Sequence, residues 1–272
     1  MKHIQTLALM ALCGVALMFA NSVSAQSTKQ GIVTVVRIQG EARYSAGDNV
    51  WHPLVAGKVL RPGAVIQSAA DSTVDIILGV VPVQVAYPNS TTQPAGLANA
   101  ADPNVRGYIV YNPKVSQNVI RMYGNTVLAV DKLTLSDTGV DAVGDTELDL
   151  RAGKIFLTVK KLSAMSQFEV KIPNGVAGIR GSSGFIGADG VVQWKTGQMV
   201  FAWTGPNGQQ FGPFIINGGF GYNPQMDTQP VPLSPEVLTF LGQLVTQVIT
   251  VLPPNEAFVN DFTKCYVSPV LN

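Results

Sequence analysis

The chain has 272 residues, of which 46% are hydrophobic and 13% are charged, with 18 basic and 17 acidic side chains. A nearly neutral chain of low charge density lacks the basic surface that binds nucleic acid or an anionic membrane, so the composition argues against both partners. The length suffices for one large or two small domains with a hydrophobic core.

Residues 1–25 have the three-part layout of a secretory signal peptide. Lys2 precedes an apolar run at 7–20, and Val23-Ser24-Ala25 supplies a small-residue ending. The apolar run is shorter than the roughly 20 residues that span a membrane, and no later stretch approaches that length. We therefore expect cleavage after Ala25 and a periplasmic or secreted protein without an integral membrane span.

Cysteine usage limits how the exported chain is stabilised. Cys13 lies inside the expected leader, so Cys265 is the single cysteine left after cleavage. The mature chain then has no intrachain disulfide, and its stability must come from packing. Cys265 is either a half-buried residue of the C-terminal tail or the site of a disulfide between chains.

The first part of the expected mature chain reads as short strands. Residues 31–45 alternate apolar and polar side chains, with many β-branched residues, and predict two strands joined by a bend at Gly40. The next block, residues 51–78, has Gly57 and Gly63 at six-residue spacing between apolar positions. This spacing predicts further short strands with frequent corners.

Residues 80–118 interrupt this pattern. They contain five prolines and a polar, alanine-rich run with no sustained period, apart from a possible strand at 108–111. We interpret the segment as an insertion that loops out of the β domain.

Strand patterns return after the insertion, with small turns at Gly124-Asn125 and Asp131 and with Gly-Pro and Gly-Asn turns between later hairpins. The expected strands lie at residues 118–123, 126–130 and 132–135, within 137–150, and at 155–159, 191–194, 199–203 and 214–216. The pattern predicts one mainly β domain over residues 31–223, built from many short strands in a solenoid-like or rolled arrangement, followed by a linker at 224–232.

One helix is expected near the C-terminus. Ser234 is suited to the N-cap, Pro235 to the first helical position and Glu236 to the first turn, ahead of a helix over 237–252. Apolar residues recur at spacings of three and four and form a stripe that includes Leu238, Leu241, Val245 and Val248. This stripe either packs on the β domain or is presented to a partner. Residues 224–272 are thus a linker, an amphipathic helix and a tail.

The stretch from Lys171 to Gly187 organises the chain. Five glycines fall within the thirteen residues 175–187, a spacing typical of short strands broken by sharp corners. Arg180 stands among them with five hydrogen-bond donors. We expect its guanidinium to bind carbonyl oxygens of neighbouring turns, with a ligand as the alternative.

Two motifs resemble the FecR domain family. The run Phe168-Glu169-Val170 leading to Pro173, then Val176-Ala177-Gly178-Ile179-Arg180-Gly181-Ser182, is similar to the family's closing motif, with Ser182 where threonine is usual. Trp51, Leu54, Gly57, Leu60 and Gly63 are similar to its opening motif, with Ala64 in place of the usual acid. The residues that we assign to the structural motif are Gly175, Gly178, Arg180, Gly181, Ser182, Trp51, Gly57 and Gly63.

The resemblance implies an all-β, solenoid-like, non-enzymatic domain that contacts other proteins of the bacterial cell envelope. The family's namesake is an inner-membrane protein that passes a siderophore-transporter signal to a sigma factor. That role requires a cytoplasmic segment and a membrane span. We expect neither in this chain and therefore do not infer iron signalling from the resemblance.

The sequence offers little to support catalysis. His52 is the single histidine outside the leader and lacks a nearby nucleophile or orienting partner. Gly181-Ser182-Ser183-Gly184 lacks the spacing of a nucleophile elbow, and Asp137, Asp141 and Asp145 lack that of a calcium loop. We predict no catalytic, cofactor-binding or metal site, although the sequence alone does not exclude a glycosidase with paired carboxylates.

The leading hypothesis is therefore an exported protein-interaction or scaffold module that binds an unidentified envelope protein. A second hypothesis is a carbohydrate- or cell-wall-binding module that uses Trp194, Trp203, Tyr108 or Tyr111 as stacking platforms. A third is a structural protein that self-associates through exposed strand edges.

Overall fold

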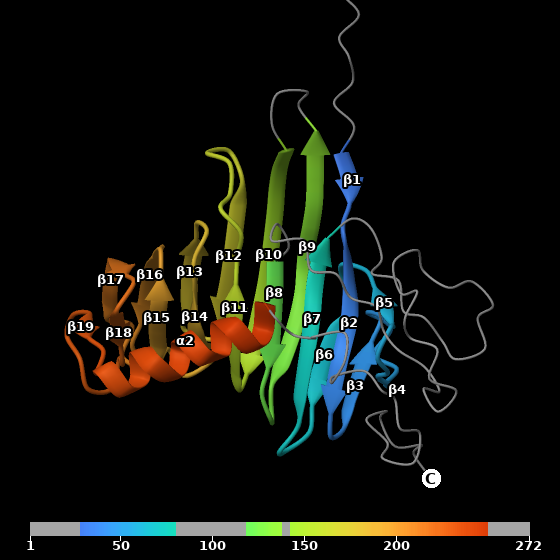
Figure 1. The fold of residues 1–272 in the computed structure, drawn as a ribbon, viewed down its shortest axis with the longest axis horizontal. Helices are drawn as coiled ribbons and strands as arrows, with labels where there is room; N and C mark the ends of the chain where they lie inside the picture. The colour runs from blue at the N-terminus through green and yellow to red at the C-terminus, as the bar shows by residue number, and fades with distance from the viewer. Residues whose placement is uncertain (1–27, 80–117, 138–141, 250–272) are drawn as a thin grey trace, which may run out of the picture.

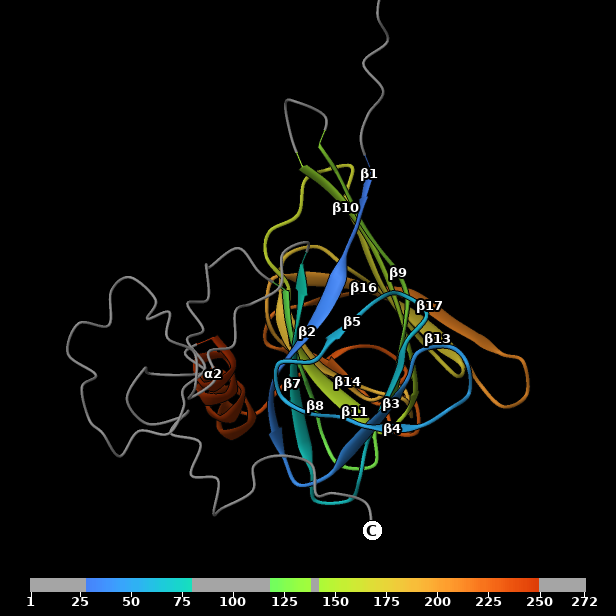
Figure 2. The ribbon, with the colours of Figure 1, turned by 90° about the vertical axis from the view of Figure 1, so that its right-hand side faces the viewer.

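The computed structural model describes residues 28–79, 118–137 and 142–249. These residues form two open β-sheets packed face to face and one helix on the outside (Figure 1, Figure 2). The mainly β fold with one C-terminal helix, predicted from the sequence, is confirmed. The expected signal peptide, the 80–117 part of the expected insertion and the Cys265 tail lie outside the described residues.

Sheet A has ten strands. They are β1 (Thr28–Gln30), β3 (Ala42–Ser45), β4 (His52–Pro53), β6 (Val65–Ser68), β9 (Val127–Asp137), β10 (Ala142–Ala152), β12 (Gln167–Ile172), β13 (Gly175–Ile179), β16 (Gln198–Thr204) and β17 (Gln210–Asn217). Their order is β17-β16-β13-β12-β10-β9-β6-β3-β4, and β1 also pairs with β9.

Sheet B has nine strands. They are β2 (Ile32–Gln39), β5 (Val59–Leu60), β7 (Thr73–Gly79), β8 (Asn118–Met122), β11 (Lys154–Thr158), β14 (Ser183–Gly187), β15 (Val192–Thr196), β18 (Phe220–Tyr222) and β19 (Val231–Pro232). Their order is β19-β18-β15-β14-β11-β8-β7-β2-β5.

The chain moves along the two sheets together. It pairs β7 with β8 in sheet B, β9 with β10 in sheet A, β12 with β13 in sheet A, β14 with β15 in sheet B and β16 with β17 in sheet A. Between β10 and β12 it crosses to sheet B as β11, so β10 and β12 lie parallel. The result is that residues 32–79 lie toward one end of both sheets and residues 192–232 toward the other (Figure 1).

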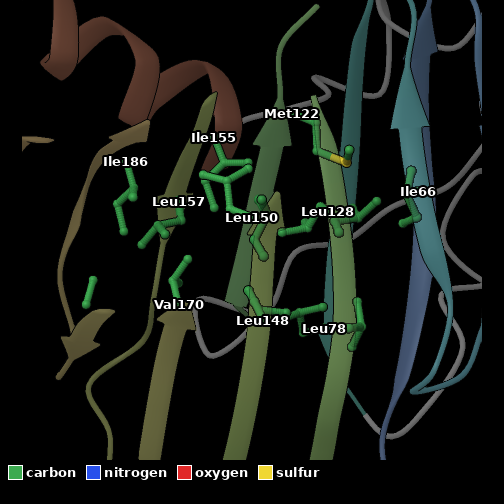
Figure 3. Close-up of a cluster of buried hydrophobic side chains, with 14 of the residues drawn as sticks. Ile66, Leu78, Met122, Leu128, Leu148, Leu150, Ile155, Leu157, Val170 and Ile186 are labelled. Atoms are coloured by element: carbon green, nitrogen blue, oxygen red, sulfur yellow. The ribbon is translucent and has the colours of Figure 1, made fainter. Parts of the chain in front are cut away.

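The core fills the space between the inner faces of the sheets (Figure 3). Strand β12 shows how the core forms. Its residues alternate between buried and more exposed positions, and Phe168, Val170 and Ile172 point inward. Fully buried side chains from both sheets meet in this way. They include Ile66, Leu128, Leu148 and Leu150 of sheet A and Met122, Ile155, Leu157 and Ile186 of sheet B.

Strand β9 differs from the prediction of a turn at Asp131. Leu148 of β10 pairs with Val130, and the neighbouring Glu147 pairs with Lys132. Asp131 is therefore the extra residue of a β-bulge in one continuous strand. A turn and a β-bulge can both place an acid within the apolar alternation. The sequence pattern around Asp131 therefore resembles a turn.

Helix α2 (Pro235–Ile249) lies across the outer face of sheet B (Figure 1, Figure 2). Its start agrees with the predicted cap, since the backbone N–H of Val237 donates to Ser234 Oγ at 3.4 Å and that of Leu238 to the Ser234 carbonyl at 3.0 Å. A hydrogen bond with Ser234 lowers the pKa of the Glu236 carboxyl. The expected end at residue 252 lies outside the described residues.

The predicted linker at 224–232 contains strand β19, which pairs with β18 and so extends sheet B. In the parts of the chain that the structure describes, no helix has the length and apolar character needed to cross a membrane.

Candidate functional site

The closing motif forms most of β12, β13 and a corner at residues 180–182 that leads into β14. Gly181 has a φ of +70°, and a Cβ added there would lie 2.6 Å from the Cα of Lys161 in the segment after β11. A side chain would thus be strained and would collide with backbone. Ser182 is buried and donates to the Gln198 carbonyl at 3.4 Å. This corner therefore holds three segments of the chain together.

Arg180 lies on the surface of the same corner. Its Nη2 donates to the Ala164 carbonyl at 3.1 Å, and Ala164 belongs to the turn before β12. Arg180 also lines a shallow hollow of about 270 Å³ with Glu169 and Val200. The turn carbonyl is the kind of partner expected for this arginine from the sequence.

The other motif glycines serve the backbone. At Gly175 an added Cβ would lie 2.5 Å from the Ala202 carbonyl oxygen of β16, whereas Gly178 has room for one. Gly57 donates to the Val35 carbonyl of sheet B, and Gly63 donates to the Val130 carbonyl of sheet A, both at 2.7 Å. The contacts at Gly175, Gly57 and Gly63 fix corners of the framework.

Trp51, the first residue of the opening motif, behaves differently because it is 39% exposed. The guanidinium of Arg43 lies over its indole, 4.5 Å from the ring centroid, and Arg43 Nε donates to Gln67 Oε1 at 2.8 Å. Around these side chains is a groove of about 340 Å³, which we call the Trp51 groove. Its lining includes Glu41, Arg43, Trp51, His52, Gln67 and Asn125.

The stacking platforms proposed from the sequence lie elsewhere. Trp194 is fully buried and Trp203 is 8% exposed, so the core of the protein already covers both rings. Tyr108 and Tyr111 lie outside the described residues. The prediction that Trp194 and Trp203 are stacking platforms is therefore wrong, because both are core residues, and the exposed tryptophan is Trp51 of the opening motif.

The strands at the ends of the two sheets differ in length and composition. The strand order of each sheet has two end strands, four in all. Three of them, β4, β5 and β19, are only two residues long. Strand β17, the fourth, has eight residues and no charged side chain. On its outer face Ile215 is 59% exposed and pairs in register with Val200 of β16, itself 47% exposed. We call this strand with Val200 the β17 edge.

The amphipathic stripe of α2 is covered by the protein itself. Leu241 and Val248 are fully buried in a cluster with Phe156 and Phe185 of sheet B, and Val245 packs against it. Leu238 is partly buried. The partner-face hypothesis for Leu238, Leu241, Val245 and Val248 is corrected accordingly, because an isolated helix buries its apolar stripe on the nearest apolar surface.

A row of ion pairs crosses the outer face of sheet B at the end of α2. Asp75, 1% exposed, accepts from Arg121 Nε at 2.7 Å and from Arg37 Nε at 2.8 Å. Arg121 Nη1 also donates to Gln247 Oε1 of the helix at 3.3 Å. Burial works to lower the pKa of Arg121, but the hydrogen bond and charge of Asp75 raise it above its ordinary value. These side chains use their hydrogen bonds on one another and on Gln247, and they hold the end of α2 against sheet B.

The remaining candidate groups do not converge. His52 packs against the Tyr44 ring at 5.4 Å between centroids, and Asp145 forms an ion pair with Lys132. Asp141 lies outside the described residues, and so does the side chain of Asp137. Within residues 28–79, 118–137 and 142–249, no three His, Cys, Asp or Glu side chains are placed to hold a metal ion.

Comparison of the chain with protein-family models, with curated proteins and with solved structures finds no match in any of the three.

Proposed function

We propose that this chain is an exported, non-enzymatic, FecR-like module of the bacterial cell envelope that binds a protein partner through the β17 edge. Its paired strands, which pass back and forth between two sheets, would then be a solenoid-like framework of the FecR kind. The occupant of the edge is an extended, uncharged segment of an envelope protein, added to sheet A as a further strand.

The single observation that carries the proposal is the difference between β17 and the other sheet ends. An edge strand presents unpaired N–H and C=O groups, and proteins protect such edges with very short strands, prolines or charged residues. Strands β4, β5 and β19 have two residues each, and two of them contain proline. Strand β17 carries Pro213 but is long and uncharged, and it exposes Ile215 on its outer face. It is the edge suited to receive a partner.

Composition also indicates the chemistry of the partner. On sheet A, the charged side chains Lys132, Glu147 and Lys171 form ion pairs on the middle strands β9, β10 and β12. The β17 edge offers Ile215 and Val200 instead. A charged residue placed against them would be desolvated without a partner, so an apolar β-forming segment is favoured.

Replacing Ile215 by lysine is expected to lower recovery of the partner at least tenfold when the tagged chain is purified from an envelope fraction. A lysine on an edge strand opposes pairing with a further strand. Because Ile215 is 59% exposed, the free energy of unfolding should change by no more than about 0.5 kcal/mol. Quantitative mass spectrometry and a denaturant titration measure the two effects.

Val59→Lys is the matched control, since Val59 is 37% exposed on the two-residue edge strand β5. It should leave the partner recovery unchanged. Equal recovery with Ile215→Lys and the wild type would contradict the proposal. If size-exclusion chromatography instead shows a dimer that Ile215→Lys dissociates, the partner is a second copy and the self-association hypothesis replaces this one.

A further inference from the structure

We infer that the Trp51 groove is a binding site for a neutral pyranose saccharide. The groove lies at the β3–β4 end of sheet A, and the β17 edge lies at the opposite end of the same sheet (Figure 1). The two sites are therefore independent, and this inference stands whether or not the edge binds a protein.

The first argument is the fixed aromatic surface. Tryptophan buries a large area when it can, as Trp194 and Trp203 do here, yet Trp51 keeps 39% of its surface exposed. The Arg43 guanidinium holds the indole from one side at 4.5 Å, and Gln67 holds the guanidinium. Because Arg43 restrains the ring from one side, a pyranose that stacks its C–H face on the exposed part of the indole loses less conformational entropy than against an unrestrained side chain.

The second argument is the balance of polar groups. Arg43 and Asn125 supply hydrogen-bond donors, while Glu41 and Asn125 supply acceptors, all lining the groove. Sugar hydroxyls both donate and accept, so they can use such a set. An anionic ligand would meet Glu41 and a cationic one would meet Arg43, which favours an uncharged saccharide over either.

The third argument is size and shape. A groove of about 340 Å³ is within the range of sites for small molecules, and its lining combines the Trp51 indole with several polar side chains. Pro53, Ala42 and Ala69 also line the groove and add to its apolar surface.

The test is titration of the mature chain with two neutral oligosaccharides, cellotetraose and tetra-N-acetylchitotetraose, with binding measured by calorimetry and by the intrinsic tryptophan fluorescence. We expect at least one of them to bind and Trp51→Ala to weaken that binding at least tenfold. Arg43→Ala should weaken it as well, because the indole loses its support. Phe220→Ala is the matched control, since Phe220 is 37% exposed on β18 at the other end of the sheets, and it should leave binding unchanged.

Three results would overturn the inference. One is that neither oligosaccharide binds the wild type, whose folding is verified by circular dichroism. Another is that Trp51→Ala, still folded by the same measure, binds as tightly as the wild type. The last is that an acidic oligogalacturonate or a proline-rich peptide binds in the Trp51 groove while the neutral sugars do not, which would assign the groove to a different ligand class.

Discussion

Replacing Asp75 by asparagine is expected to lower the free energy of unfolding by about 3–5 kcal/mol, measured by denaturant titration. Asp75 is 1% exposed and bridges Arg37 and Arg121, whose side chains are 23% and 7% exposed. Asparagine keeps the shape but removes the negative charge, so the Arg121 cation remains buried beneath α2 without a counter-charge. The cost is mainly this uncompensated charge and not the loss of a contact.

Glu147→Gln is the control for this change. Glu147 accepts from Lys171 Nζ at 2.8 Å, but the two side chains are 32% and 44% exposed. Solvent screens such a pair, so its removal should cost no more than about 1 kcal/mol. An Asp75→Asn variant that is as stable as Glu147→Gln would show that the ion row does not support the helix.

Replacing Leu241 by alanine is expected to destabilise the whole protein by about 2–5 kcal/mol. Leu241 on α2 is fully buried in the cluster with Phe156 and Phe185 of sheet B, so the truncation would remove apolar contacts and leave a cavity there. Thermal or denaturant unfolding followed by circular dichroism measures the change. Gln243→Ala, on the exposed side of α2, should alter stability by no more than about 0.5 kcal/mol.

The same variant distinguishes the two sequence-based hypotheses for the helix. If the stripe of α2 served a partner, Leu241→Ala would leave stability unchanged and reduce partner recovery. In the structure the stripe packs on sheet B, so Leu241→Ala should lower the free energy of unfolding. Unchanged stability would contradict the packing of α2 on sheet B.

The strands could largely be predicted because their signal is local. The alternation of Phe168, Val170 and Ile172 is visible in the sequence, and these residues are buried in β12. The N-cap at Ser234 was equally readable, because Ser-Pro-Glu is a local signal for a helix start. The two-layer arrangement could not be read in this way, since register between distant strands depends on contacts that no local pattern specifies.

The same distinction applies to the candidate sites. Trp194 and Trp203 are inward in β15 and β16 because they alternate with Gln193 and Ala202, and this phase was available in the sequence. Trp51 precedes a two-residue strand, so no alternation determines its side, and its exposure emerged from the fold. The β17 edge depends on which strand ends the sheet, which is a property of the complete topology.

Site-specific photocrosslinking in living cells tests the central claim most directly. A photoreactive amino acid at position 215, on the outer face of β17, should give a discrete adduct with one envelope protein, identified by mass spectrometry. The same group at position 59, on β5, should not give that adduct. No adduct from position 215, or the same adduct from both positions, would contradict a framework that binds its partner through the β17 edge.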